Sequence, residues 1–413
     1  MKNKANVPQI RFAGFTDAWE QRKLGEIADK VIEKNVGLQY IETFTNSAEF
    51  GIISQRDFFN HDITKIGSLD GYYIVRSEDF VYNPRISASA PVGPINRNKT
   101  SRTGVMSPLY TVFRPHGVDT TYLEYFFKSK YWHSFMNFNG DSGARSDRFS
   151  IKDSVFFEMP IPIPYMEEQE IIGKCLSNLD NLITLHQHEC DLLDEFKQTC
   201  LQKMFPKKGS NVPEIRFTGF SDDWEHRKLG EMGTTYTGLS GKSKSDFGHG
   251  DGNYVTYMNV FLNPVANSKT VEPIEIDMKQ NEVKFGDVFF TTSSETPEEV
   301  GMSSIWLGNS ENTYLNSFCF GYRLTERLDP FYLAYMLRSF PIRKRIVLLA
   351  QGISRYNVSK NKMMEIRVPV PKLEEQQQIG MYFYNLDCLI TLHRHELEEL
   401  QNIKKTMLEK MFV

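Results

Sequence analysis

The sequence has little cysteine and no long apolar segment. Only five cysteines occur in 413 residues, and no two of them form a Cys-x-x-Cys pair. Neither a dense disulfide framework nor a structural zinc site is therefore expected, and the thiols should be reduced. No segment approaches the roughly 18 apolar residues of a membrane helix, and the first residues lack the apolar core of a signal peptide. We therefore expect a soluble cytoplasmic protein without membrane contact.

An excess of charge of one sign is also missing. Lysine and arginine total 48 against 52 aspartates and glutamates, which gives a net charge of −4. This balance excludes a uniformly basic surface that would coat itself with nucleic acid, so any basic patch must be local. The hydrophobic share of 40% is enough for globular cores, and the chain length predicts two or three domains.

Motifs of known catalytic chemistry are absent as well. The sequence contains no phosphate-binding Gly-x-x-x-x-Gly-Lys-Ser/Thr loop, no His-Glu-x-x-His and no Gly-x-Ser-x-Gly. Asn83-Pro-Arg departs from the Asn/Asp-Pro-Pro-Tyr/Phe signature of amino-methyltransferases. His186 and His188, like His393 and His395, are two residues apart on expected helices, where they would not face each other, so no metal site is expected. We expect a chain without catalytic residues.

The sequence does contain a long internal repeat. The segment from Val7 to Ile27 reads VPQIRFAGFTDAWEQRKLGEI, and fifteen of its 21 positions are identical in VPEIRFTGFSDDWEHRKLGEM, from Val212 to Met232. A second block, EEQEIIGKCLSNLDNLITLHQHE, starts at Glu167 and returns from Glu374 as EEQQQIGMYFYNLDCLITLHRHE. The chain therefore consists of two tandem halves that share their ends, while their middles have diverged.

Each second block has the pattern of a long coiled-coil helix. Apolar positions follow one another in steps of three and four from Ile172 to Met204 and from Ile379 to Met411. Because only residues 206–211 separate the first helix from the second half, we expect the helices to run antiparallel. The predicted fold is α+β, with two globular domains joined by two long helices that form an antiparallel coiled coil, and with pseudo-two-fold symmetry. The alternative is two amphipathic helices inside one larger core.

The repeat and the helix pattern predict five segments. These are a first globular domain at 1–165, a first coiled-coil helix at 166–205, a linker at 206–211, a second globular domain at 212–371 and a second helix at 372–413. Within the domains, short apolar runs predict strands at 71–75, 79–82, 109–113, 254–258, 287–291 and 318–322, and helices are expected at 120–138 and 330–350.

Basic residues are concentrated in equivalent parts of the two halves. Residues 85–152 contain ten basic and four acidic residues, and residues 332–364 contain seven basic and no acidic ones. Lysine and arginine interleaved with Tyr, Phe, Asn and Ser suit contacts to phosphates and base edges. The recurrence in both halves favours a nucleic-acid surface over an ordinary solvated face. Candidate DNA-contacting residues from these segments are Arg85, Arg97, Lys99, Arg102, Arg145, Arg148, Phe149, Ser150, Arg343, Lys344, Arg345, Arg355, Tyr356, Asn357 and Lys360.

Two loops in these segments align through their arginines. Gly143-Ala-Arg-Ser-Asp-Arg-Phe-Ser-Ile matches Gly352-Ile-Ser-Arg-Tyr-Asn-Val through Arg148 and Arg355 when the downstream prolines are superposed. Each loop combines a glycine, an arginine and small polar residues, so it could approach a backbone closely. The alternative is that each arginine pairs with a carboxylate inside its own domain.

The duplicated blocks closely resemble one family, the specificity subunits of type I restriction-modification systems. The resemblance spans essentially the whole chain and includes Thr237-Gly-Leu-Ser-Gly-Lys-Ser-Lys and Thr291-Thr-Ser-Ser-Glu. It implies two target-recognition domains that bind a bipartite DNA sequence and recruit two methyltransferase subunits, with restriction and translocase subunits added. S-adenosylmethionine, ATP and Mg are then expected on the partners, and this chain binds no cofactor. It adds Lys242, Lys244, Thr291, Thr292 and Ser293 to the candidate DNA contacts.

Two other classes of protein remain as alternatives. A coiled-coil scaffold or adaptor would carry the same helices without reading DNA itself. A self-contained nuclease or methyltransferase would need catalytic motifs that the sequence lacks.

Overall fold

The computed structural model describes residues 6–59, 66–141, 147–308 and 311–412. The chain divides into two compact units: unit 1 contains Met1–His186 and Glu396–Val413, and unit 2 contains Gln187–His395. Within the described ranges, no helix is long and apolar enough to cross a membrane.

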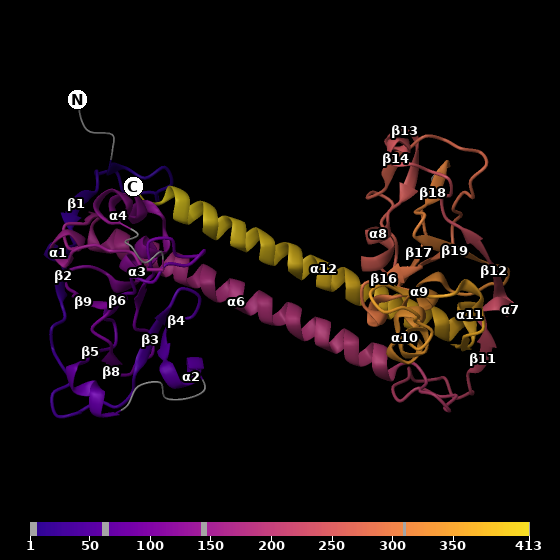
Figure 1. Ribbon diagram of the computed structural model, residues 1–413, viewed down its shortest axis with the longest axis horizontal. Helices are drawn as coiled ribbons and strands as arrows, with labels where there is room; N and C mark the ends of the chain where they lie inside the picture. Colours follow the sequence, from indigo (N-terminus) through magenta and orange to yellow (C-terminus); the bar gives the residue numbers. More distant parts are fainter. Residues whose placement is uncertain (1–5, 60–65, 142–146, 309–310, 413) are drawn as a thin grey trace. The chain divides into compact units, whose positions relative to one another are not determined.

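Both predicted long helices are confirmed. Helix α6 spans Met166–Lys203 and helix α12 spans Leu373–Lys410, each with 38 residues (Figure 1). Residues of the predicted heptad seam are buried, among them Leu176 on α6 and Phe383 on α12. Each unit contains a part of both helices, and in each unit the two parts run antiparallel. In unit 1, for example, Lys404 pairs with Asp180, whereas the earlier Glu396 pairs with the later His186.

Unit 1 is built around a four-stranded antiparallel sheet in the order β2-β9-β6-β7. Its helix α3 packs on this sheet, because the ring of Phe127 lies 5.9 Å from that of Phe80 and 6.0 Å from that of Phe113. The strands are β1 (Glu20–Lys23), β2 (Ala28–Lys30), β3 (Phe44–Ser47), β4 (Gly51–Ser54), β5 (Tyr73–Val75), β6 (Phe80–Tyr82), β7 (Ile95–Arg97), β8 (Gly104–Met106), β9 (Thr111–Pro115) and β10 (Pro160–Ile163). The shorter helices are α1 (Leu24–Ile27), α2 (Gln55–Phe59), the 3-10 helix η2 (Ile66–Gly71), α3 (Thr120–Lys128), α4 (Tyr131–Asn139) and α5 (Asp153–Phe156).

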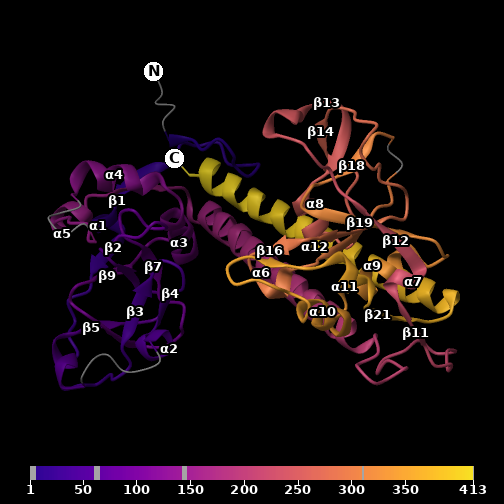
Figure 2. The ribbon, with the colours of Figure 1, turned by 45° about the vertical axis from the view of Figure 1, so that its right-hand side comes forward.

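Unit 2 contains an equivalent four-stranded sheet in the order β12-β19-β15-β17. Its other large sheet, β14-β13-β18, lies apart from the helices α9 and α10 (Figure 2). The strands are β11 (Glu225–Lys228), β12 (Gly233–Thr237), β13 (Phe247–Val255), β14 (Glu272–Ile274), β15 (Val288–Thr291), β16 (Ser293–Ser294), β17 (Ser303–Ile305), β18 (Thr313–Leu315), β19 (Cys319–Leu324), β20 (Tyr356–Asn357) and β21 (Arg367–Val370). The shorter helices are α7 (Leu229–Met232), η3 (Lys244–Asp246), α8 (Tyr257–Leu262), η4 (Pro297–Glu299), α9 (Pro330–Arg338), α10 (Phe340–Val347) and α11 (Lys360–Met364).

A buried carboxylate marks the same position in both central sheets. Asp79, just before β6, accepts two hydrogen bonds from the guanidinium of Arg114, at 2.7 and 2.8 Å. Asp287, just before β15, accepts the same pair from Arg323, at 2.8 and 2.7 Å. A buried carboxylate needs such a partner, and this requirement explains why Asp79 and Asp287 align although the surrounding segments have diverged.

The helices predicted at 120–138 and 330–350 are wrong as single helices, since each is two helices with a break. Ser129 separates α3 from α4, and Ser339 separates α9 from α10; both have extended backbone, with ψ of 174° and 149°. Each serine hydroxyl donates to a carbonyl three residues earlier at 2.6 Å, so it satisfies the end of the first helix. Pro341 adds to the break in unit 2, because it has no backbone N–H with which to continue α9 and is tolerated in the first turn of α10.

The strand predicted at 254–258 is only partly correct. Strand β13 ends at Val255, and α8 begins at Tyr257. The Thr256 hydroxyl accepts a hydrogen bond from the backbone N–H of Asn259 at 3.2 Å, which caps this helix. The capping threonine therefore overrides the β-strand preference of its neighbours.

The repeated motifs of the sequence form the joint between each globular part and its long helix. In unit 1 the Arg11 guanidinium donates to both oxygens of Glu168, at 2.7 and 2.8 Å, and the Trp19 indole N–H donates to the same carboxylate at 3.2 Å. In unit 2 Arg216 binds Glu375 in the same way, at 2.7 and 2.9 Å. Both glutamates are buried on the first turn of their helix. The repeat is therefore maintained by a joint that the two repeated blocks of each half must build together.

A carboxylate about three turns further along each helix ties three elements together. Asp180 of α6 accepts hydrogen bonds from the Tyr125 hydroxyl at 2.8 Å and pairs with Lys404 of α12 at 2.5 Å. Burial opposes the ionised form, but these partners and Lys128 outweigh it and lower the pKa of Asp180. Asp387 repeats the arrangement in unit 2, where it binds Tyr335 and Lys197.

The ends of both long helices are inserted into globular cores. Phe412 packs against Tyr122 and Phe126 in unit 1, with ring centroids 5.6 and 6.0 Å apart. Phe205 occupies the equivalent place in unit 2, at 5.9 Å from both Tyr332 and Phe383. The duplicated Lys-Met-Phe endings therefore each place a phenylalanine in the hydrophobic core of one unit.

We predict that Gly380→Ala destabilises the protein although alanine is the better helix former. A Cβ atom at Gly380 would lie 2.4 Å from the backbone nitrogen of Tyr332, an overlap that must move one backbone against another. The expected cost of about 1 to 3 kcal/mol exceeds the gain of about 1 kcal/mol in helix propensity. At the equivalent Gly173 the closest contact would be 3.1 Å, so Gly173→Ala is the milder matched variant. Thermal unfolding of both measures this, and a raised Tm for Gly380→Ala would contradict it.

We also predict that Glu168→Gln lowers the free energy of unfolding by about 3 to 5 kcal/mol, because it leaves the buried charge of Arg11 without its counter-ion. The side chain of Glu168 is fully buried and that of Arg11 is 10% exposed, so solvent screening is small. Urea unfolding would measure the loss. The matched control is Glu158→Gln, which removes an exposed ion pair with Lys23 and should change stability little. Equal effects of the two substitutions would refute the role of the buried joint.

Candidate nucleic-acid interface

In unit 1 the predicted arginine loop pairs with the segment that follows strand β6. Arg85 and Arg148 face each other in an antiparallel bridge. The backbone N–H of Phe149 donates to the Pro84 carbonyl at 2.7 Å, and that of Ile86 donates to the Asp147 carbonyl at 3.0 Å. The Phe149 side chain is buried, whereas Arg85 and Arg148 are exposed. Phe149 therefore anchors a loop that presents two arginines to solvent.

Unit 2 builds the same arrangement from different residues. Strand β16 pairs with β20, so that Ser293 lies opposite Asn357, and the N–H of Val358 donates to the Thr292 carbonyl at 3.0 Å. This pairing brings together two motifs that are far apart in the sequence. Arg355 is exposed, and its guanidinium lies 5.6 Å from the centre of the Phe318 ring.

Glycine is required at the base of the unit 2 loop. Gly352 has a φ of +142°, and a Cβ atom there would lie 2.0 Å from the carbonyl oxygen of Arg355. Only glycine fits this close approach, so the backbone turn that presents Arg355 is fixed by the sequence.

A cleft lies beside each arginine. In unit 1 a cleft of about 360 Å³ is lined by Arg148, Ser150, Tyr73 and Tyr110, among others. In unit 2 a cleft of about 580 Å³ is lined by Arg355, Ser293 and the ring-bearing residues of α8. Arginine beside aromatic and hydroxyl side chains offers a phosphate contact and base-edge contacts on one surface.

Several predicted DNA contacts of unit 1 are instead bound to acids of their own domain. Arg97 is 10% exposed and pairs with Glu78 and Glu124, at 3.0 and 2.6 Å. Lys99 shares Glu124 at 3.2 Å, and Arg102 pairs with Glu42 at 2.6 Å. The positive charge counted for residues 85–152 is thus partly neutralised by acids from outside that segment. Arg145 lies outside the described residues.

Unit 2 likewise binds some of its predicted contacts internally. Arg343 donates to the carbonyls of Gly301 and Val300, both at 2.7 Å, and of Glu298 at 2.8 Å. Burial lowers the pKa of Arg343 to about 10, which leaves the side chain charged at neutral pH. Thr291 is completely buried, which removes it from the accessible surface and corrects its prediction as a DNA contact. Arg343 is partly exposed, but its guanidinium is engaged with these carbonyls, and its role as a DNA contact stays a prediction.

Three further candidates of unit 2 are also restricted. Lys242 is 14% exposed and pairs with Asp277 at 2.8 Å. Arg345 donates to the carbonyl of Arg367, and Ser293 is buried. They contribute less to an accessible surface than the sequence indicates.

Six predicted basic side chains form neither an ion pair nor a hydrogen bond with another described residue. Five of them are exposed and Lys360 is partly exposed, as are Tyr356 and Thr292, which lie near them. These six basic residues are Arg85, Arg148, Lys244, Lys344, Arg355 and Lys360. Arg85 with Arg148, and Arg355 beside Asn357, form what we call the arginine surfaces of units 1 and 2.

The aromatic residues that line both clefts could not be recognised from the sequence. Tyr73 and Tyr110 come from or flank strands of unit 1, and Tyr257 and Phe261 come from α8 of unit 2. No motif marks them, since only the long-range strand pairing brings them beside the arginines.

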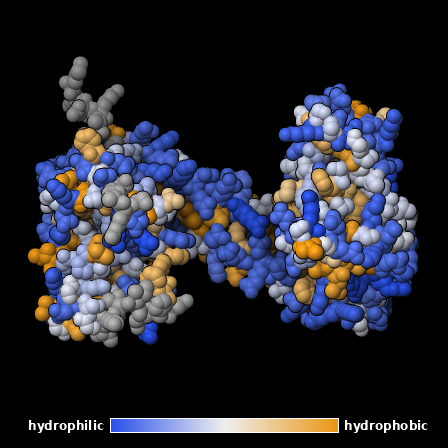
Figure 3. All heavy atoms as spheres, in the orientation of Figure 1, coloured by the Kyte–Doolittle hydropathy of each residue, from blue (hydrophilic) through white to orange (hydrophobic). Residues whose placement is uncertain are grey.

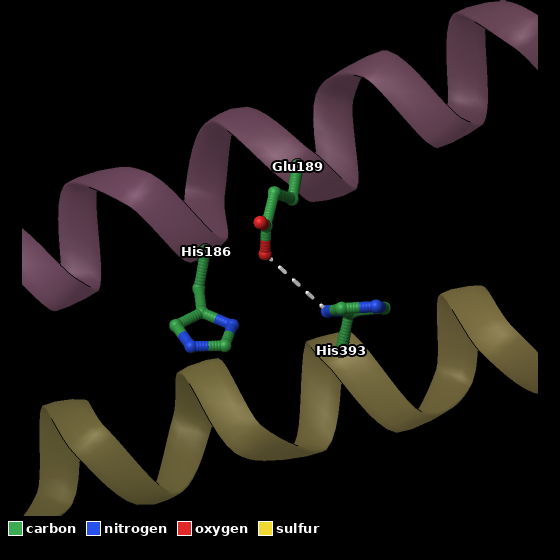
Figure 4. A group of neighbouring side chains, drawn as sticks. All are labelled: His186, Glu189 and His393. Atoms are coloured by element: carbon green, nitrogen blue, oxygen red, sulfur yellow. Dashed lines mark ion pairs between the residues drawn. The ribbon is translucent and has the colours of Figure 1, made fainter.

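The histidines of the long helices are engaged with glutamates: Nδ1 of His393 lies 3.6 Å from Glu189 in unit 2 (Figure 4), and Nδ1 of His186 lies 3.8 Å from Glu396 in unit 1.

Curated relatives of the chain come from Methanocaldococcus jannaschii. The putative type I restriction enzyme MjaX specificity subunit is 27% identical over 280 residues, which cover 63% of this chain and 60% of the relative. The type I restriction enzyme MjaVIII specificity subunit is 25% identical over 293 residues, which cover 62% of each protein. The chain therefore matches about three fifths of the length of these relatives.

Solved structures share the fold along nearly the whole chain. The S subunit of a type I restriction-modification system from M. genitalium has a TM-score of 0.58 at 14% identity, covering 98% of this chain and 99% of that chain. The HsdS subunit from Thermoanaerobacter tengcongensis has a TM-score of 0.50 at 16% identity, covering 95% and 96%. The family model for the type I restriction modification DNA specificity domain matches residues 16–194 and again 221–402. With both halves matched, the chain belongs to the family of type I restriction-modification DNA specificity proteins.

Proposed function

We propose that this chain is the sequence-specific DNA-binding subunit of a type I restriction-modification complex. Each unit reads one half of a bipartite, asymmetric site on double-stranded DNA. The long helices recruit two methyltransferase subunits, to which restriction and translocase subunits are added. The chain itself is non-catalytic and binds no cofactor, so S-adenosylmethionine, ATP and Mg belong to the partners. The complex acts in the cytoplasm.

The observation that carries this proposal is the repeated arginine surface. Both units present exposed arginine on a loop that is paired with the segment following the second strand of the central sheet. A scaffold without its own sequence readout would have no need for this repetition, so the family membership and the two surfaces together favour DNA reading. The surrounding side chains differ between the units, because Ser150 and two tyrosines in unit 1 correspond to Asn357 and a different set in unit 2. Different surfaces would read different half-sites, which gives an asymmetric site.

The recruitment of partners is supported by a second apolar stripe on the long helices. Besides the buried seam, α6 and α12 carry exposed apolar residues, and three of those on α6 have an apolar equivalent on α12. Figure 3 shows apolar atoms among hydrophilic ones on the exposed surface of these helices. In unit 1 the stripe consists of Leu182 and Leu185 of α6 and Ile403 of α12, and in unit 2 it consists of Leu192 and Phe196 of α6 and Leu389 and Leu392 of α12. Such an exposed apolar set on each unit suits an apolar helix of a partner, and we assign the two sets to methyltransferase subunits.

Replacing the arginines of the two surfaces tests the DNA-reading role. We expect Arg148→Ala and Arg355→Ala to leave folding intact, since both side chains are exposed, and to weaken DNA binding. A phosphate contact would lower the salt dependence by about one unit for all sequences alike, whereas a base contact would cost about 1 to 3 kcal/mol at one position. The measurement is a titration of the methyltransferase complex at several salt concentrations, on the site mapped from methylated bases in a host.

Arg102→Ala is the matched control for this experiment. Arg102 is also exposed, but Glu42 already neutralises it, so the loss of DNA affinity should be smaller. Unchanged affinity of both arginine-surface variants, combined with a lowered Tm, would show that these arginines are structural and would refute the proposed surfaces.

Substitutions in the apolar stripe test the recruitment of the methyltransferase. Leu185 and Leu392 occupy equivalent positions and are 52% and 54% exposed, so their change to glutamine should not affect folding. If a partner helix covers them, each loses about 1.5 to 3 kcal/mol of binding, at least tenfold in affinity. Titration with the purified methyltransferase subunit measures this. Thr184→Ala and Thr391→Ala, at equivalent exposed positions outside the stripe, should bind normally. Full binding by the leucine variants would rule out the stripe as the docking site.

A further inference from the structure

An unpaired carboxylate lies in the cleft beside Arg355. Glu295 follows directly on strand β16, is exposed, and lines the cleft of unit 2 together with Arg355. It forms no hydrogen bond or ion pair with another described residue. Glu299, which lines the same cleft, differs, because it accepts a hydrogen bond from the Ser294 hydroxyl at 3.0 Å. Glu295 thus offers a free acceptor in the same cleft as the exposed guanidinium of Arg355.

The backbone that carries Glu295 is held by its neighbours. Strand β16 is paired with β20, which follows Arg355 directly. The backbone segments next to Glu295 and Arg355 are therefore hydrogen-bonded to each other. The Tyr257 hydroxyl donates to the carbonyl of Ser293 at 2.8 Å and holds the start of β16 against α8. The rings of Tyr257 and Phe261 stack at 5.9 Å with an angle of 17° and form an apolar wall of the cleft. A side chain on such a support can select a ligand by geometry.

A carboxylate on a DNA-binding surface is unfavourable unless DNA offers it a donor. It repels the phosphates, which carry the same charge, and it repels the carbonyl oxygens of guanine and thymine in the major groove. The exocyclic amino groups of cytosine (N4) and adenine (N6) are the donors that the major groove presents. A free acceptor beside Arg355 therefore fits a base that carries an amino group, and it rejects one that presents a carbonyl there.

We propose that Glu295 is a specificity-determining residue that accepts a hydrogen bond from the amino group of a cytosine or an adenine in the half-site of unit 2. This inference rests on the proposed DNA-reading function and deepens it by naming the chemistry of one recognised base. Removal of Glu295 should affect DNA binding differently from removal of the arginines, because its charge is negative. Removal of Glu295 lowers discrimination at one base pair, while binding to unrelated DNA stays equal or becomes tighter because a repulsive charge has gone.

The experiment compares Glu295→Ala with Glu298→Gln in the complete methyltransferase complex. Glu298 is exposed on the adjoining 3-10 helix, carries the same charge and does not line the cleft, so it is the matched control. Duplexes with each base pair of the unit 2 half-site exchanged are titrated. We expect one position at which the wild type and Glu298→Gln discriminate by roughly 5- to 150-fold, corresponding to about 1 to 3 kcal/mol, and at which Glu295→Ala does not. The salt dependence should not fall.

Base analogues then separate the two sources of the amino group. Pyrimidin-2-one replaces cytosine and 2-aminopurine replaces adenine, and each lacks the amino group in question. The wild type should lose affinity for one of them, and Glu295→Ala should not respond to that replacement. If Glu295→Ala retains every preference while the wild type reads the half-site normally, this inference fails and the proposed function stands. If the wild-type complex shows no sequence preference in that half-site, both fail. Thermal unfolding of each variant excludes a folding defect.

Discussion

The architecture depends on a buried carboxylate at the first turn of each long helix. Glu168 and Glu375 are removed from water, where an ionised group is tolerated only with a charged partner in good geometry. Arg11 and Arg216 supply that partner from segments near the start of each half. Because the joint needs an arginine, a glutamate and their supporting neighbours at once, none of these segments can change alone. This constraint accounts for the sequence repeat more directly than any requirement of the globular cores does.

The same constraint explains why the middles could diverge. The joints are built from the start of each half and the first turn of each long helix, whereas the clefts are lined by other segments. In unit 1 these are Tyr73, Tyr110 and the loop of Arg148 beside the central sheet, and in unit 2 they are α8, β16 and the turn that carries Arg355. The surface chemistry beside Arg148 and Arg355 is therefore set by parts of the chain that contribute little to the joint. Such a division lets one frame carry surfaces with different preferences.

The sequence predicts what depends on local periodicity and repetition, and it misses what depends on distant pairing. The long helices followed from a heptad pattern that Leu176 and Phe383 satisfy. The breaks at Ser129 and Ser339 were missed, because a serine that caps a helix looks like any polar residue on its surface. Charge counted by segment was misleading for Arg97 and Arg102, since Glu78 and Glu42 reach them from a turn and a loop outside the counted segment. The partnership of Thr292 and Ser293 with Arg355 depends on the pairing of two-residue strands, which no pattern of that length reveals.

The insertion of Phe412 into the core of unit 1 imposes an order on folding. Unit 2 comes from one continuous stretch, whereas the hydrogen bond from Tyr131 to the carbonyl of Glu409 spans 278 residues. At about 5 to 20 residues per second, a ribosome needs on the order of tens of seconds to make that interval. During this time Tyr122 and Phe126 have no partner from the end of the chain, while Phe205, with the same Lys-Met-Phe context, has already been made. The core of unit 1 can therefore be completed only after the segment around Phe412 has been made.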